Sequence, residues 1–195
     1  MRIPGQIAVR VLSCCVLAAT PAMALGQAGA PAKPAVGTPQ APSAIYGRLL
    51  SLLEKEFVSA AEAMPEDKFD FAPPATAGDF KGVRSFGEQL KHVAGSNYFF
   101  FNTTGATEDA LKAKGESIAK LKTKAEIVQA VKDSFTQAHA YVDGITPENA
   151  FVTTASGTRA GMASFGMAHM MDHYGQLVVY LRMNGVVPPA SRGGN

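Results

Sequence analysis

The chain has 195 residues, 47% of them hydrophobic and 17% charged, so it can bury a sizeable core and is not expected to be disordered throughout. Its formal net charge is +2, but two of the 18 basic residues, Arg2 and Arg10, lie in the first 24 residues, which contain no acid. Removing these two leaves 16 basic residues against 16 acidic ones, with no basic stripe to attract a polyanion. Nucleic-acid binding is therefore not expected.

Residues 1–24 are typical of a secretory signal peptide. Arg2 and Arg10 give a positively charged N-terminal region, and residues 11–19 form an apolar run. Residues 22–24 have the small-x-small pattern that signal peptidase cleaves. The segment is too short for a stable membrane span, although a retained membrane anchor is the alternative interpretation. We expect an exported protein, periplasmic or extracellular after cleavage, with no stable membrane span in the mature chain.

Both cysteines, Cys14 and Cys15, lie in this early segment. The rest of the chain therefore has neither a disulfide nor a cysteine nucleophile. Residues 25–42 are rich in Ala, Pro and Gly and almost uncharged, which predicts a flexible linker because such a segment cannot bury an apolar face. The folded domain is expected over residues 43–195.

The first element of that domain is a helix predicted over residues 43–65, where apolar residues recur at helical spacing. Ser43 is a suitable N-cap and Pro65 ends the helix. A loop rich in proline and glycine follows. We expect Phe69 and Phe71 to attach this loop to the rest of the domain.

The second helix is predicted from about residue 86 to 102. Ser85 and Glu88 have the spacing of a capping box, in which each side chain satisfies a free amide at the start of the helix. Residues 103–121 are expected to form a loop, with room for one helical turn near 108–112.

The third helix is predicted from a second capping box at Thr123 to about Asp143. Residues 145–159 are expected to form a loop with room for a short hairpin. The fourth helix is predicted from about residue 161 to 184, before Gly185. Four such helices and no strand-rich block predict an all-α four-helix bundle with long inter-helix loops.

The last predicted helix is apolar nearly all round, yet it carries His169 and His173 four residues apart. Two imidazoles at this spacing lie one above the other and can reach one metal ion. The alternative is a pair of histidines that hydrogen-bond to polar neighbours. His92 lies near the middle of another long helix, so three histidines from two facing helices could meet in the bundle. The fourth histidine, His139, is expected at a helix edge and not as a ligand.

Residues 84–101, RSFGEQLKHVAGSNYFFF, and residues 168–189, AHMMDHYGQLVVYLRMNGVVPP, resemble the DinB-like proteins, and the resemblance spans about residues 45–190. It implies a four-helix bundle with a three-histidine metal site, whose ligands carry over to His92, His169 and His173. In that family an arginine typically follows the last ligand. Tyr174 takes its place here, which puts an anion contact at that position in doubt. The family name refers to damage induction and implies no DNA chemistry.

Four further side chains are candidates for the surroundings of the metal or for a pocket: Glu88, Gln89, Tyr174 and Gln176. Glu88 lies four residues before His92 on the same helix face and could orient the ring. Its alternative role is to close the capping box with Ser85.

The implied cofactor is a divalent transition metal, with Zn, Ni or Fe all compatible with imidazole ligands. The resemblance implies a metal-dependent transferase or hydrolase acting on an unidentified small-molecule substrate. The alternatives are a non-catalytic metal-binding module and a bundle that dimerises through its apolar last helix. A homodimer is compatible with each of these functions.

Overall fold

The computed structural model describes residues 33–193. The predicted signal peptide, residues 1–24, and the first part of the predicted linker lie outside the described residues. The chain divides into residues 1–38 and residues 39–195, and the second unit holds every helix and strand of the described part. None of the described helices is long and apolar enough to cross a membrane.

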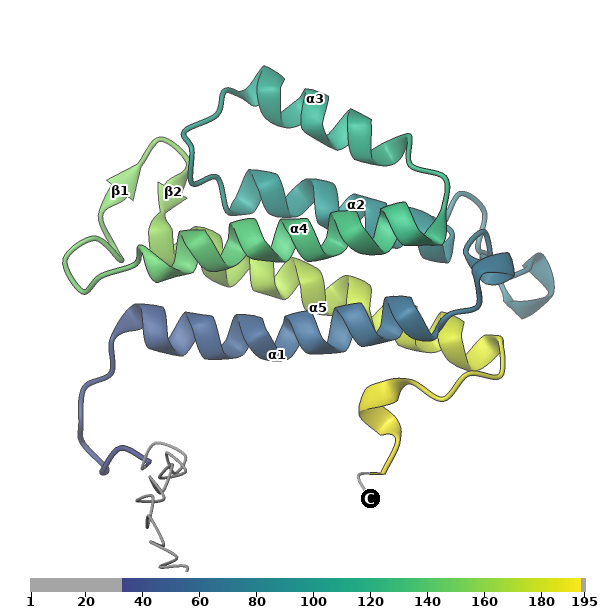
Figure 1. Cartoon of the computed structure of the whole chain (residues 1–195), viewed down its shortest axis with the longest axis horizontal. Helices are drawn as coiled ribbons and strands as arrows, with labels where there is room; N and C mark the ends of the chain where they lie inside the picture. Colours follow the sequence, from purple (N-terminus) through teal and green to yellow (C-terminus); the bar gives the residue numbers. More distant parts are fainter. Residues whose placement is uncertain (1–32, 194–195) are drawn as a thin grey trace, which may run out of the picture. The chain divides into compact units, whose positions relative to one another are not determined.

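Four long helices form the bundle (Figure 1): α1 (Pro42–Ala63), α2 (Phe86–Phe100), α4 (Lys124–Asp143) and α5 (Arg159–Met183). Helix α1 packs against α4 and α5, and α2 packs against the same two helices, so the order around the bundle is α1, α4, α2, α5. Helices α2 and α5 are therefore neighbours along one edge. The predicted all-α bundle is confirmed.

The segment predicted as a loop before the third bundle helix contains a fifth helix, α3 (Glu108–Ala119), so the expectation of at most one helical turn there was wrong. Thr107 caps it by accepting a hydrogen bond from the amide of Ala110. Figure 1 shows α3 outside the bundle, beside α2, against which it packs. Because Ile118 is its one buried residue, α3 has almost no apolar periodicity from which to predict it.

The connections contain only short elements. The loop before α5 holds the expected hairpin, with strands β1 (Thr153–Thr154) and β2 (Gly157–Thr158). Three single turns of 3-10 helix complete the described secondary structure: Glu66–Lys68, Ala75–Ala77 and Pro189–Ser191.

The loop between α1 and α2 is attached to the bundle by the two predicted phenylalanines. Phe69 packs edge-on against Phe86, and Phe71 packs edge-on against Tyr180 of α5. The carbonyl oxygens of Phe71 and Phe69 also accept hydrogen bonds from the amides of Phe86 (2.8 Å) and Gly87 (2.7 Å). These contacts fix where α2 begins, and the predicted capping box of Ser85 and Glu88 is present there.

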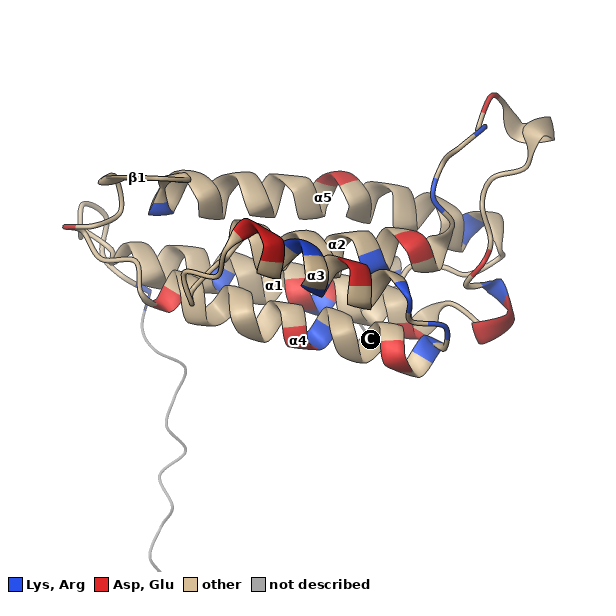
Figure 2. Cartoon of the chain, turned by 90° about the horizontal axis from the view of Figure 1, so that it is seen from above, with Lys and Arg blue, Asp and Glu red and all other residues tan. Residues whose placement is uncertain are grey.

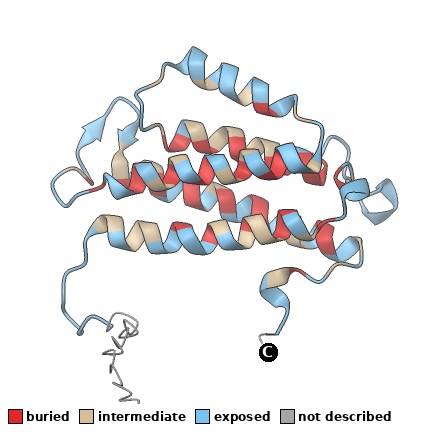
Figure 3. Cartoon of the chain, in the orientation of Figure 1, coloured by how far each residue is buried: buried red, intermediate tan, exposed pale blue. Residues whose placement is uncertain are grey.

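The core lies between the four long helices, whose buried faces turn toward one another (Figure 3). Its largest fully buried side chains include four phenylalanines: Phe57 of α1, Phe86 and Phe101 at the two ends of α2, and Phe135 of α4. A buried polar pair also joins α2 to α4, because the Nδ2 of Asn97 donates to the Oγ of Ser134 at 3.0 Å. This packing holds α2 at a fixed position against α5.

Candidate metal centre

Three histidine side chains meet where α2 passes α5. His92 comes from the middle of α2, and His169 and His173 come from successive turns of α5. The Nε2 of His169 lies 3.1 Å from the Nε2 of His92 and 3.2 Å from the Nε2 of His173. The candidate ligand atoms of all three residues lie within 4.8 Å of one another. The structure therefore brings together the three histidines that the sequence predicted as ligands.

These separations fit nitrogens arranged around a single ion. Metal–nitrogen bonds of about 2.0–2.1 Å place two ligand nitrogens ~3.4 Å apart at tetrahedral angles and ~2.9 Å apart at octahedral right angles. The two short Nε2–Nε2 distances, 3.1 and 3.2 Å, fall between those values. Three imidazole nitrogens this close together cannot all satisfy one another by hydrogen bonds, whereas a shared cation satisfies all three.

A chain of side-chain hydrogen bonds fixes the orientation of His173. Its Nδ1 donates to the Oε1 of Gln89 at 2.6 Å, and the Nε2 of Gln89 donates to the Oε1 of Gln176, also at 2.6 Å. The Nε2 of Gln176 reaches the carboxylate of Asp172 at 3.5 Å. An amide oxygen only accepts, so the Nδ1 of His173 carries the proton and its Nε2 presents a lone pair to the shared point. Gln89 and Gln176 thus lie beside the triad, as the sequence led us to expect.

We expect Gln89→Leu to weaken metal binding by about 10–100-fold, because removing a partner that orients a ligand histidine has effects of that size. Gln89 is 2% exposed, and leucine fills similar space without an acceptor for the Nδ1–H of His173. Competition titration against a chelator of known affinity measures the change. Gln89→Glu keeps the acceptor and is the matched control, which should retain most of the affinity. Equal losses in both variants would contradict an orienting role.

All three imidazoles are held in the neutral form that binds metals. Burial lowers the pKa of His92 from 6.5 to about 4, with smaller contributions from the positive charge of Arg84 and from His173 and His169. Burial is also the largest cause of the lowered pKa values of His169 and His173, which the carboxylate of Asp172 partly opposes. At neutral pH the three nitrogens can therefore act as ligands without first losing a proton.

The metal-free protein should become less stable as the pH falls from about 6.5 toward 4. Folded His92 has a pKa near 4 but an unfolded imidazole has a pKa near 6.5, so over this range the unfolded chain binds more protons and unfolding is favoured. The stabilisation is complete above about pH 6.5. Thermal unfolding in chelator at a series of pH values measures the decline. His92→Gln should make the decline shallower without removing it, because the pKa values of His169 and His173 are lowered as well. An unchanged slope in that variant would contradict this origin.

A cavity of about 650 Å³ lies beside His92. Helix α2, helix α3 and the loop before α2 supply its lining: Gly82, Val83, Arg84, Glu88, Lys91, His92, Gly95, Ser96, Gly115 and Ala119. Glu88 thus lines the cavity as well as closing the capping box, where its Oε2 accepts from the amide of Ser85 at 2.8 Å. Of the three histidines, only His92 lines this cavity, so a small molecule in it would lie next to His92.

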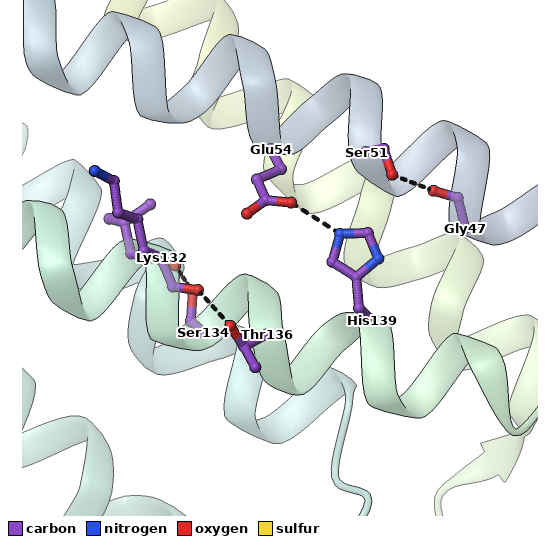
Figure 4. A network of polar contacts seen from close by, with 8 residues as sticks. Gly47, Ser51, Glu54, Lys132, Ser134, Thr136 and His139 are labelled. Carbon is purple, nitrogen blue, oxygen red and sulfur yellow. Dashed lines mark hydrogen bonds and ion pairs between the residues drawn. The ribbon is translucent and has the colours of Figure 1, made fainter. Parts of the chain in front are cut away.

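Two other predicted positions lie elsewhere. The ring of Tyr174 packs against Phe57 of α1 with centroids 5.7 Å apart, so it faces the core rather than the cavity. His139 on α4 is 2.9 Å from the carboxylate of Glu54 on α1 (Figure 4), in agreement with its prediction as a non-ligand.

Two residues beside the site were given no role in the sequence prediction. The ring of Phe100 lies 5.2 Å from that of His169, and Arg84 lines the cavity and acts electrostatically on all three histidines. The sequence could have indicated that Arg84 lies near His92. It directly precedes the capping residue Ser85 and comes about two helical turns before His92.

The family model of the DinB superfamily matches residues 49–177 of the chain. The matched region runs from the middle of α1 into α5 and contains all three histidines of the triad. No curated protein matches the chain.

Proposed function

The chain belongs to the DinB superfamily, and from this premise we propose that it is an exported metalloprotein. His92, His169 and His173 hold one divalent transition metal, and the metal serves a transferase or hydrolase reaction on a small molecule. The observation that carries the proposal is the convergence of three neutral Nε2 atoms at separations of 3.1 and 3.2 Å.

The number of ligands supports a reactive rather than a structural ion. Three protein ligands leave coordination positions open, whereas structural ions are usually enclosed by four. The cavity beside His92 has room for a substrate next to those positions. Imidazole ligands suit zinc, nickel and iron, so the ligand set alone does not select among them.

An ion at this site would supply Lewis acidity, which polarises an oxygen and lowers the pKa of a bound water or thiol. The chain's own residues have separate tasks. Gln89 and Gln176 hold the ring of His173 with its Nε2 lone pair directed at the shared point. The ring of Phe100 packs against that of His169, with centroids 5.2 Å apart, and so limits the positions that the imidazole can adopt. Glu88 lines the cavity, but the capping box holds its carboxylate.

Elemental analysis of protein purified without a histidine tag tests the metal. About one equivalent of a transition metal per chain is expected, and less than about a tenth of an equivalent would overturn the proposal. The reaction is tested by measuring whether the metal-loaded protein turns over a panel of esters and a panel of acceptors for thiol transfer. The His173→Ala variant is expected to be inactive in the same assays. Equal activity in both proteins would remove the enzymatic part.

The N-terminal sequence supports the exported part of the proposal. Residues 1–24 have the charge, apolar run and small-residue pattern of a secretory signal. Mass spectrometry of the protein from its native cells tests this, because a cleaved chain should begin near residue 25. An intact N-terminus would contradict cleavage.

The outer face of α5 supports a second candidate, a bundle that dimerises, with or without catalysis. Phe165, Met171, Val179 and Met183 are 63%, 45%, 52% and 41% exposed on one helix. Figure 2 shows this helix almost free of charge along its length, with Asp172 as its acidic residue. Exposed apolar surface of this kind commonly marks an interaction site. Sedimentation equilibrium would show a dimer if α5 is that interface and a monomer if it is not.

A further inference from the structure

Arg84 is placed where it can act on a molecule next to the triad. Its backbone oxygen accepts a hydrogen bond from the Oη of Tyr180 at 3.2 Å, which ties it to α5, the helix that carries His169 and His173. Its side chain lines the cavity together with His92.

The other charged side chains of the cavity are already engaged. The Nζ of Lys91 donates to the carbonyl oxygens of Ala119 and Leu121, at 3.1 and 3.3 Å, and so caps the end of α3. The carboxylate of Glu88 is held by the amide of Ser85. Among the described residues, none forms a hydrogen bond or ion pair with the guanidinium of Arg84, so its five donors remain for a ligand.

The position of Arg84 is unfavourable for the fold by itself. A helix N-terminus carries a partial positive charge, so a cation there is destabilising by a small amount. Arg84 directly precedes Ser85, the N-cap of α2, and is exposed. It therefore has no evident contribution to stability that would account for an arginine at this place.

We propose that the cavity binds a small organic carboxylate, whose carboxylate group pairs with Arg84 while the rest of the molecule lies beside His92. This rests on the proposed function, because a divalent ion at the triad adds to the positive charge that attracts an anion. The planar guanidinium matches a carboxylate with two parallel hydrogen bonds. A cavity of about 650 Å³ is ample for such a molecule.

The start of α2 favours a carboxylate over a phosphate as the anion. Phosphate sites at helix N-termini use several free amides. Here the amides of Phe86 and Gly87 donate to the carbonyl oxygens of Phe71 and Phe69, and the amide of Glu88 donates to the Oγ of Ser85. The first turn of α2 therefore has no free amides to surround a phosphate, and recognition falls to the guanidinium alone.

Calorimetric titration of the zinc-loaded protein with butyrate and with butyramide tests the inference. The two probes are nearly the same size, but butyrate carries one carboxylate and butyramide carries none. Wild type should bind butyrate about tenfold more tightly than butyramide, as expected for one charge-assisted pair. Arg84→Gln should reduce that preference to less than about twofold. Arg48→Gln removes the same charge from an exposed position on α1, which does not pack against α2, and should keep the preference.

The outcomes separate this inference from the proposed function. Failure of the wild type to bind zinc, nickel or iron would overturn both. Normal zinc uptake with the same preference for butyrate over butyramide in Arg84→Gln and wild type would overturn the carboxylate site alone, as would no measurable binding of butyrate. Tighter binding of inorganic phosphate than of butyrate would also overturn it, because the first turn of α2 has no free amides to surround a phosphate.

Discussion

Replacing His169 by alanine is expected to abolish stoichiometric metal binding. His169 is the central member of the triad, since its Nε2 is 3.1 Å from that of His92 and 3.2 Å from that of His173. Loss of a residue that only hydrogen-bonds to a ligand histidine costs ~10–100-fold in metal affinity. Loss of a ligand itself should therefore cost more than about a hundredfold. Metal content after gel filtration and the rise in melting temperature on adding metal both measure the effect.

His139→Ala is the matched control for this variant. His139 lies on α4, where it pairs with Glu54 of α1, and both side chains are partly exposed. An ion pair of this kind contributes about 1 kcal/mol or less to stability. The control should therefore keep one metal per chain and melt at nearly the same temperature. Loss of metal in the control, or retention of one equivalent in His169→Ala, would show that the ion is bound elsewhere.

The sequence was sufficient for the parts of the site that follow from helical spacing. His169 and His173 share a face of α5 because they are four residues apart. The two capping boxes indicated where α2, which carries His92, and its neighbour α4 begin. That His92 would meet this pair required the order of helices around the bundle, which the resemblance to the DinB-like proteins supplied. Packing of α2 directly against α5 confirms that expectation.

The same spacing argument shows why Tyr174 was misplaced as a pocket candidate. It follows His173 directly, so its side chain points about 100° away around the helix. In the structure that direction leads to Phe57 of α1 rather than to the cavity. Gln176 is three residues after His173 and returns to the same face, where it reaches Gln89. Adjacency in sequence was a poorer guide than helical periodicity.

Helix α3 and the role of Arg84 could not be predicted from local patterns. Helix α3 buries one side chain, Ile118, and therefore gives little apolar periodicity, yet it forms one wall of the cavity through Gly115 and Ala119. The position of Arg84 beside the triad depends on contacts between distant segments, including the hydrogen bond from Tyr180. Such contacts become visible only when the helices are packed.

The separation of the imidazoles depends on how closely α5 approaches α2, and Gly166 sets that distance. A Cβ atom at residue 166 would lie 2.7 and 2.8 Å from two ring carbons of Phe101 and 3.0 Å from the Cβ of Phe100. Phe101 is fully buried, so its ring cannot swing out into solvent without disturbing its neighbours. Phe100 also packs against His169, which lies one turn further along α5. The glycine thus permits the approach that brings the α5 histidines to His92.

We expect Gly166→Ala to destabilise the protein by about 2 kcal/mol, although alanine is favoured over glycine in a helix by ~1 kcal/mol. Overpacking a core costs ~1–3 kcal/mol and occasionally more, and contacts as short as 2.7 Å place this site at the upper end. Gly175→Ala is the control on the same helix, because a Cβ there meets nothing within 4 Å. It should stabilise by ~0.5–1 kcal/mol. Chemical denaturation of both variants measures the difference.

The same pair of variants links packing to the metal site. We expect relief of the clash at residue 166 to move α5 away from α2, which would separate His169 and His173 from His92. Metal affinity should therefore fall in Gly166→Ala and stay unchanged in Gly175→Ala, even under conditions where both proteins are fully folded. If Gly166→Ala were destabilised but bound metal as tightly as wild type, the helix spacing would matter for stability alone. If it were stabilised, the close approach of α5 to Phe101 would not exist in solution.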